Sequence, residues 1–410
     1  MSKLPDVLSP IPSPTRRRLL AALGISSLVG AAPIELRGAD DQSEYLFAPG
    51  LTYLNTAALG PTTRAVLERT LEAWRELESN PVYMGYSDGP AHVAADRVRS
   101  AAANLLGCTA DEILLTRSTT EAMTDLAHSV PLRRGDRVLI TDQEHNGGIV
   151  GWQYRARRDG VLVDVVPIAP TDHDPGAIVQ RFAAAITRRT KVISVSHVLF
   201  ATGLRMPIAE LAALARSRGI FCVVDGAQAV GQIEVDVKAL GCHAYATAGH
   251  KWLMGPKGTG LLYVSRDATG IELVQWELGK AFITEASGVG SHPLASGLVV
   301  AIEAMAARGL AAVERHNLAL RERAYEGFAQ LPQLTLMSVP RGPLATAIVS
   351  ARLPADIDAR ALITTLREKH RVVIKRIEES LFNGIRFSPH IFNTEADVDA
   401  ALAALRTELA

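Results

Sequence analysis

The strongest constraint on the fold of this chain is a regular alternation of two kinds of segment. From Thr52 onward, short β-branched and apolar runs alternate with alanine-rich amphipathic stretches. This alternation is typical of an α/β fold, in which helices connect the strands of a largely parallel sheet. The expected strands are Glu112–Thr116, Arg137–Thr141, Leu162–Pro167, Lys191–His197, Ile220–Asp225 and Gly260–Val264. The expected helices include Ala91–Leu106, Gly176–Ile186 and Ile208–Ser217.

The pattern changes near Pro293. One long helical stretch, through Gln330, is followed by short strand patterns at Leu334–Val339 and Thr346–Leu353, then a helix near Ala359–Lys369, two further strands and a terminal helix. A chain of 410 residues is long enough for more than one domain. We therefore predict a leader over residues 1–44, a large domain over 45–292 and a smaller C-terminal α/β domain over 293–410. The N-terminal arm is expected to pack near the smaller domain.

Charge and cysteine content exclude several functional classes. The chain has 43 basic and 43 acidic residues, which gives no electrostatic basis for binding nucleic acid or an anionic membrane. Cys108, Cys222 and Cys242 form no CxxC pair, and there is no HExxH sequence. Neither a disulfide framework nor a common zinc motif is therefore predicted. We expect a small-molecule ligand and no metal.

Residues 1–44 have the layout of a signal peptide. The Arg16-Arg17 pair and Arg18 precede an apolar run from Leu19 to Ala32, and small residues end that run. The run is too short to cross about 30 Å of hydrocarbon as a helix, so a stable membrane anchor is not expected. The paired arginines resemble a twin-arginine signal, which predicts export to the periplasm. The alternative is a disordered basic leader on a cytoplasmic enzyme.

Four groups of polar residues lie at strand ends, where open α/β sheets bind ligands. Ser118-Thr119-Thr120-Glu121 has capping-box spacing at the start of a helix, whose free amide groups favour an anion such as phosphate. Glu144-His145 follows the strand ending at Thr141. Taken alone, the first group could be an ordinary helix cap and His145 a solvated loop residue.

The other two groups contain a carboxylate and a lysine. Asp225 ends an apolar strand and precedes Gly226, so its buried carboxylate needs a cationic or donor partner unless it is only a helix cap. Lys251 lies between His250 and Trp252 in a glycine-rich loop. The glycines precede a strand, so they do not form a dinucleotide-binding fingerprint. A phosphate site, an imidazole, a strand-end carboxylate and a loop lysine are together what pyridoxal 5'-phosphate (PLP) requires.

These motifs resemble the class V aminotransferase family of fold-type I PLP enzymes. The resemblance covers Tyr53 to Leu405 and rests on six motifs in the family's order. They are Tyr53-Leu54-Asn55-Thr56-Ala57, Thr119-Thr120-Glu121, Glu144-His145, Asp225-Gly226-Ala227-Gln228, His250-Lys251-Trp252 and the segment from Arg386 to Asn393-Thr394. The resemblance implies a large, mostly parallel-sheet domain with a smaller C-terminal α/β domain.

The resemblance also implies a role for each matched residue. Lys251 would be the Schiff-base lysine and general base, Asp225 the partner of the pyridine nitrogen, and His145 a group stacked on the ring. Gln228 would donate to the ring hydroxyl. Arg386 would bind the substrate α-carboxylate, and Asn55 would line the substrate pocket. The expected phosphate contacts are Ser118, Thr119, Thr120, Thr247 and His250, with Gly290 and Ser291 reaching the phosphate of a second subunit in a homodimer.

Departures from the family pattern bear on the reaction. Phe200 occurs where many members have a polar residue, Ala248 replaces the usual serine, and residues 371–386 lack the persulfide cysteine of cysteine desulfurases. The pattern is most similar to the isopenicillin N epimerase-like branch. It implies an enzyme that acts at Cα of an amino acid or an amino-acid-derived metabolite through an external aldimine, by transaminase or epimerase chemistry. The alternatives are a C–S lyase that uses no protein persulfide and a catalytically inactive binding protein.

Overall fold

The computed structural model describes residues 42–84, 90–273 and 290–410, all within one compact unit, residues 35–410. The predicted signal sequence lies outside the described residues. No single described helix is long and apolar enough to cross a membrane, and only one pair, bent by 80°, reaches that length and composition.

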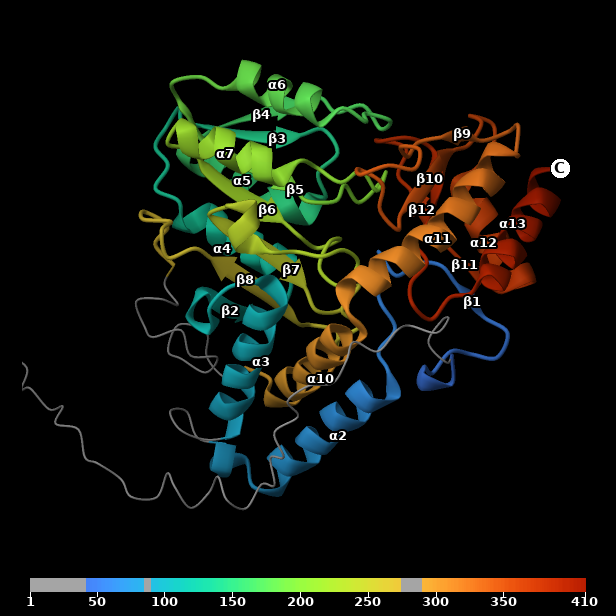
Figure 1. Cartoon of the computed structure of the whole chain (residues 1–410), viewed down its shortest axis with the longest axis horizontal. Coiled ribbons are helices and arrows are strands. Elements are labelled where there is room, and N and C mark those ends of the chain that lie inside the picture. The colour runs from blue at the N-terminus through green and yellow to red at the C-terminus, as the bar shows by residue number, and fades with distance from the viewer. Residues whose placement is uncertain (1–41, 85–89, 274–289) are drawn as a thin grey trace, which may run out of the picture. The chain divides into compact units, whose positions relative to one another are not determined.

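A seven-stranded sheet forms the larger part of the fold (Figure 1). Its order is β2-β8-β7-β6-β5-β3-β4, and β8 is antiparallel to both neighbours while the pairs from β7 to β4 are parallel. The strands are β2 (Ile113–Thr116), β3 (Arg137–Thr141), β4 (Leu162–Val166), β5 (Thr190–Ser196), β6 (Phe221–Asp225), β7 (Ala244–Ala248) and β8 (Gly260–Val264). The predicted mostly parallel α/β sheet is confirmed, although β7 was not predicted.

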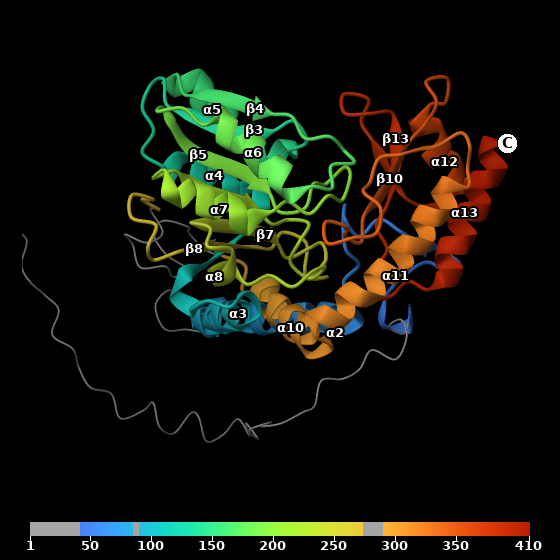
Figure 2. The same cartoon turned by 45° about the horizontal axis from the view of Figure 1, so that its top comes forward.

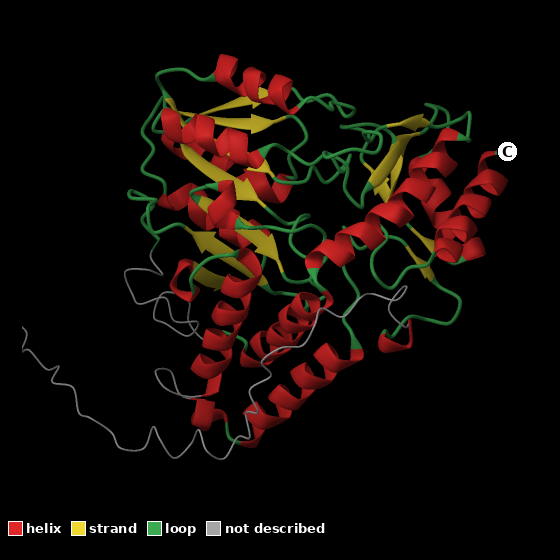
Figure 3. Cartoon of the chain, viewed as in Figure 1, coloured by secondary structure: helices red, strands yellow, loops and turns green. Residues whose placement is uncertain are grey.

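Helices cover both faces of this sheet (Figure 3). Successive residues of β6 alternate between two apolar clusters, one on each face of the sheet: Cys222 and Val224 belong to the first and Val223 to the second. A parallel sheet covered on both faces has such strands, apolar on both sides. The helices around the sheet are α3 (Pro90–Leu106), α4 (Thr119–Ser129), α5 (Asn146–Asp159), α6 (Pro175–Ala185), α7 (Ile208–Ser217) and α8 (Val237–Leu240).

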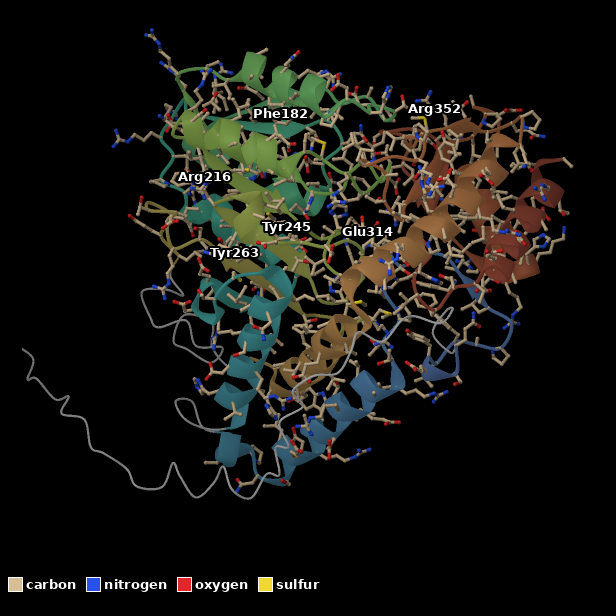
Figure 4. All side chains as sticks on the ribbon, viewed as in Figure 1. Phe182, Arg216, Tyr245, Tyr263, Glu314 and Arg352 are labelled. Carbon is tan, nitrogen blue, oxygen red and sulfur yellow. The ribbon has the colours of Figure 1, made fainter. Side chains whose placement is uncertain are left out.

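The predicted helix from Pro293 to Gln330 is two helices, α10 (His292–Arg308) and α11 (Leu310–Ala329). They meet at Gly309, whose φ of +76° ends the first helix. Helix α10 packs beside α3 and α2 (Arg64–Ser79), as Figure 2 shows, and its apolar residues join the core of the large sheet. Glu314, labelled on α11 in Figure 4, accepts a hydrogen bond from Arg205 of the large-sheet region.

A second, smaller sheet lies in the C-terminal part. Its antiparallel strands, in the order β12-β13-β10-β9, are β9 (Thr335–Leu336), β10 (Val349–Arg352), β12 (Lys375–Ile377) and β13 (Gly384–Phe387). Helices α12 (Ala359–His370) and α13 (Glu395–Leu409) pack on it around a separate apolar cluster.

Strand β1 (Thr52–Tyr53) pairs in parallel with β11 (Val372–Val373), so the N-terminal arm contacts this region. Short 3₁₀ helices are Gln42–Glu44, Pro81–Met84 and Ala110–Glu112. The domain boundary at residue 293 stays a prediction, since α10 packs with the larger sheet.

Candidate active site

A cavity of about 730 Å³ opens beyond the carboxyl ends of the parallel strands. Its wall includes residues that follow β2, β3, β6 and β7, and residues of β12 and β13 from the smaller sheet. Nine predicted site residues line it: Ser118, Thr119, Thr120, His145, Asp225, Gln228, His250, Lys251 and Arg386. These nine residues, from Ser118 to Arg386, come from distant parts of the sequence and line the same cavity.

Lys251 lies in the loop between β7 and β8. This loop is held closed by hydrogen bonds from Gly249 N to Thr259 O at 2.9 Å and from Met254 N to Lys251 O at 3.0 Å. Burial lowers the pKa of Lys251 to about 8, an effect that the Asp225 carboxylate opposes and that Arg386 reinforces. A lowered lysine pKa increases the fraction of neutral amine, the form that acts as a nucleophile or a base.

Asp225 ends β6 and is 5% exposed. Its Oδ1 accepts a hydrogen bond from Ala227 N at 2.9 Å, while a Cβ at Gly148 would lie 2.8 Å from Oδ2. Burial raises the pKa of Asp225, and the positive charge of Lys251 and the His145 imidazole act in the opposite direction. The next residue must be glycine because a Cβ at Gly226 would lie 2.0 Å from the Tyr245 ring, which is labelled in Figure 4.

His145 is the N-cap of α5, and its Nδ1 accepts a hydrogen bond from Gly147 N at 3.0 Å. The neutral ring therefore carries its proton on Nε2. Burial and the nearby Lys251 charge lower the pKa of His145. The Phe200 ring contacts the imidazole edge-on, with 5.1 Å between centroids, and so restricts the orientation of the imidazole.

Gln228 is held at both ends of its side-chain amide. Nε2 donates to Ala57 O at 2.9 Å, and Oε1 accepts from Trp252 Nε1 at 2.8 Å. One Nε2 hydrogen remains for a ligand in the cavity. Trp252, the residue after Lys251, thus orients the side-chain amide of Gln228.

The N-terminus of α4 forms the anion-binding end of the cavity. Ser118 Oγ accepts from Glu121 N at 3.1 Å, so this hydroxyl caps the helix as the sequence predicted. Thr119 Oγ1 and His250 Nδ1 are buried and have no hydrogen-bond partner among the described residues. These atoms and the free first-turn amides are suited to a phosphate.

Arg386, on β13, is 1% exposed. Its Nη1 donates to Phe200 O at 2.6 Å and its Nη2 to Asn55 Oδ1 at 3.4 Å, whereas Nε has no partner among the described residues. Burial lowers the pKa of Arg386 to about 10. No carboxylate of the described residues forms an ion pair with this guanidinium, so an anionic ligand would provide its counter-charge.

The class V aminotransferase model matches residues 52–401. This chain belongs to the class V aminotransferase family. It is 29% identical over 382 residues to isopenicillin N epimerase of Streptomyces clavuligerus, covering 88% of this chain and 95% of that protein. It is 32% identical over 308 residues to cysteine desulfurase of Salmonella typhimurium, covering 70% of this chain and 74% of that protein. The predicted family and enzyme class are confirmed.

A solved structure extends the likeness to the fold. It is a variant of the cystine C–S lyase C-DES with glycine covalently linked to its PLP cofactor. The TM-score is 0.79 at 24% identity, over 89% of this chain and 99% of that one. Class V aminotransferases are PLP-dependent, which confirms the predicted cofactor. The cavity fits it, because the partnerless Thr119 and His250 atoms suit its phosphate and the buried Asp225 carboxylate suits a ring N–H.

Four predicted site residues do not line this cavity. Thr247 Oγ1 donates to Gly226 O at 3.3 Å within the large sheet. Asn55 Oδ1 accepts a hydrogen bond from Arg386, and Ser291 caps α10 by accepting from Leu294 N at 3.4 Å, next to Gly290. Their predicted roles in binding cofactor or substrate stay predictions.

Two lining residues were missed as functional candidates by the sequence analysis. Glu144 accepts from Ser196 N at 3.0 Å and from Thr141 Oγ1 at 2.8 Å, and burial raises its pKa to about 7. Its place in the Glu144-His145 motif after a predicted strand was the available signal, but no role was assigned to it. Lys375 on β12 lies opposite Arg386 on β13, a pairing that depends on strand register and has no sequence motif.

The described residues contain no reactive-cysteine site in the cavity and no group of metal ligands. Burial raises the pKa of the Cys108 and Cys222 thiols to about 12 and that of Cys242 well above its ordinary value. None of the three lines the cavity. Within residues 42–84, 90–273 and 290–410, no three His, Cys, Asp or Glu side chains are grouped as metal ligands.

Proposed function

We propose that this class V enzyme acts at Cα of an amino acid or an amino-acid-derived metabolite, and that Lys251 moves the Cα proton. The supporting observation is that one cavity contains a lysine of lowered pKa, a buried strand-end carboxylate and a buried arginine without a carboxylate partner. Proton transfer at neutral pH requires a base of this kind.

Each of the main cavity residues has a separate role in this proposed reaction. PLP, when bound, supplies an aldehyde for the amino group and a ring that accepts electrons from Cα. Asp225 would hold a proton at its ring nitrogen, His145 would contact the ring, and Thr119 and His250 would bind its phosphate. Arg386 binds the α-carboxylate, which fixes the orientation of Cα toward Lys251. Lys251 Nζ accepts the Cα proton and returns it.

Transamination and epimerisation are our first proposals for the net reaction, supported by similarity to an epimerase over 95% of its length. The second candidate is C–S cleavage without a protein persulfide. It is supported by the likeness to the cystine C–S lyase C-DES. The buried thiols of raised pKa are unsuited to accept sulfur from a bound substrate, which argues against a protein persulfide.

Exchange of the Cα proton for deuterium tests the shared step. The PLP-loaded enzyme is incubated with a panel of amino acids in D₂O, and amino acids and products are identified by mass spectrometry and chiral chromatography. We expect exchange with at least one amino acid, and its loss in Lys251→Ala. The matched control is Lys369→Gln, because Lys369 forms an exposed ion pair with Glu408 outside the cavity. No exchange with any amino acid would contradict the proposal and favour an inactive binding protein.

We further propose a homodimer with shared sites. Gly290 and Ser291 do not line the cavity of their own chain, which is compatible with contact to the phosphate of a partner subunit. A dimer in light scattering and a weaker PLP affinity in Ser291→Ala are expected. A monomer that retains full PLP affinity would contradict this.

Export to the periplasm is proposed from the Arg16-Arg17 pair and the apolar run after it. A twin-arginine route carries folded protein, so PLP could be bound before export. The alternative location is the cytoplasm.

A further inference from the structure

Lys375 and Arg386 form a pair of cations on one face of the smaller sheet. They are direct partners in the antiparallel register of β12 and β13, and both line the cavity. Directly opposite residues of such a pair point to the same face, with Cβ atoms about 5 Å apart. We call these two residues the cation pair.

The same face of the sheet continues to Ser350 on β10, the register partner of Arg386. Ser350 Oγ donates to Ala201 O at 2.5 Å, and Arg386 donates to the adjacent Phe200 O. Ser350 and Arg386 therefore both bond to the loop after β5. The side chain of Lys375, the third member of this row, has no hydrogen bond or ion pair with any described residue, although its backbone belongs to the β12–β13 ladder.

The carboxylates on the cavity wall are engaged elsewhere. Glu378 forms an ion pair with Arg376 at 2.5 Å, Asp142 Oδ1 accepts from Ile168 N at 2.9 Å, and Glu144 accepts from Ser196. Asp225 accepts from Ala227 N at the opposite, strand-end side of the site. Among the described residues no carboxylate forms an ion pair with either member of the cation pair, and Glu378, the one carboxylate whose charge favours protonated Lys375, is itself paired with Arg376.

Like charges placed directly opposite on a sheet destabilise it. The pKa of Lys375 is lowered by burial first and by the Arg386 charge second, while the Glu378 carboxylate acts in the opposite direction. One carboxylate bound to Arg386 would neutralise only one of the two charges. A ligand with two acid groups would neutralise both.

We propose that the cation pair binds a diacidic amino acid: Arg386 binds its α-carboxylate and Lys375 binds a second acid group on its side chain. This inference rests on the proposed function, since it names the substrate class of the same site. It predicts that the enzyme prefers amino acids with an acidic side chain over uncharged ones of the same length.

Binding of diacids without an amino group tests the cation pair apart from catalysis. Calorimetry with the PLP-loaded enzyme compares glutarate, which has two carboxylates, with butyrate, which has one. We expect wild type to prefer glutarate and Lys375→Gln to reduce this preference by about tenfold, the size expected for one charged hydrogen bond. Lys375→Arg should restore much of the preference, and the surface control Lys369→Gln should keep all of it.

The rates of Cα deuterium exchange for glutamate and norvaline provide the second measurement. Lys375→Gln should lower the glutamate-to-norvaline ratio of kcat/KM by a similar factor. Equal affinity of the wild type for glutarate and butyrate would overturn the inference, as would equal losses for both ligands in Lys375→Gln. If glutarate is preferred but no amino acid exchanges its Cα proton, the proposed function fails while the cation pair stands as a diacid site.

Discussion

Replacing Arg386 with leucine separates two roles that a buried arginine can have, ligand binding and stabilisation of the fold. The guanidinium is 1% exposed, and burial lowers its pKa to about 10. A depression of this size corresponds to about 3 kcal/mol of unfavourable free energy for the charged side chain. The substitution removes this cost and also removes the hydrogen bonds to Phe200 O and Asn55 Oδ1.

The two effects on stability nearly cancel. A hydrogen bond from a charged donor contributes about 1.5 to 3 kcal/mol, and the bond to Asn55, at 3.4 Å, is long. We therefore expect the free energy of unfolding of Arg386→Leu to lie within about 2 kcal/mol of the wild-type value. Binding of an α-carboxylate should lose about 3 kcal/mol, roughly a hundredfold in affinity.

Urea unfolding measures stability, and titration of the cofactor absorbance with an amino acid measures affinity. Arg321→Leu is the matched control, because Arg321 is also 1% exposed and has a partnerless Nε but lies outside the cavity. It should affect stability without changing amino-acid affinity. The reasoning is refuted if Arg386→Leu loses PLP and amino-acid affinity equally, or if it is destabilised by far more than the control.

Three further predictions concern the lysine, the cysteines and the leader. PLP should load onto the cofactor-free enzyme faster as the pH rises through about 8, because the lowered pKa of Lys251 makes its neutral amine available there. Stopped-flow absorbance measures the loading rate at each pH, and Lys251→Ala should lack the visible band. A pH midpoint of the loading rate near the pKa of an ordinary lysine would contradict the prediction. A variant with all three cysteines replaced by alanine or serine should keep its turnover, with modest stability losses; a folded, PLP-loaded variant without turnover would restore the desulfurase hypothesis. Replacing Arg16-Arg17 with two lysines should retain the protein inside the cell, and normal periplasmic accumulation in a fractionation experiment would count against the twin-arginine signal.

Most strands of the large sheet could be predicted because their residues carry the signal locally. Arg137–Thr141 and Gly260–Val264 begin and end at the predicted residues. The missed strand β7 reads Ala-Tyr-Ala-Thr-Ala, with a single β-branched residue, and all five residues are buried. Its conformation is determined by pairing with β6 and β8 on either side, and such pairing outweighs local propensity.

The sequence by itself determined which chemical groups meet at the strand ends. Parallel strands end at one edge of a sheet, so His145 and Asp225 could be placed together from the order of their segments, and Lys251 joined them through the resemblance to PLP enzymes. Only the tertiary structure decided that Lys375 faces Arg386, because strand register depends on how the whole smaller sheet packs. Burial and partners, which set the lowered pKa of Lys251, likewise arise only when distant segments enclose the same cavity.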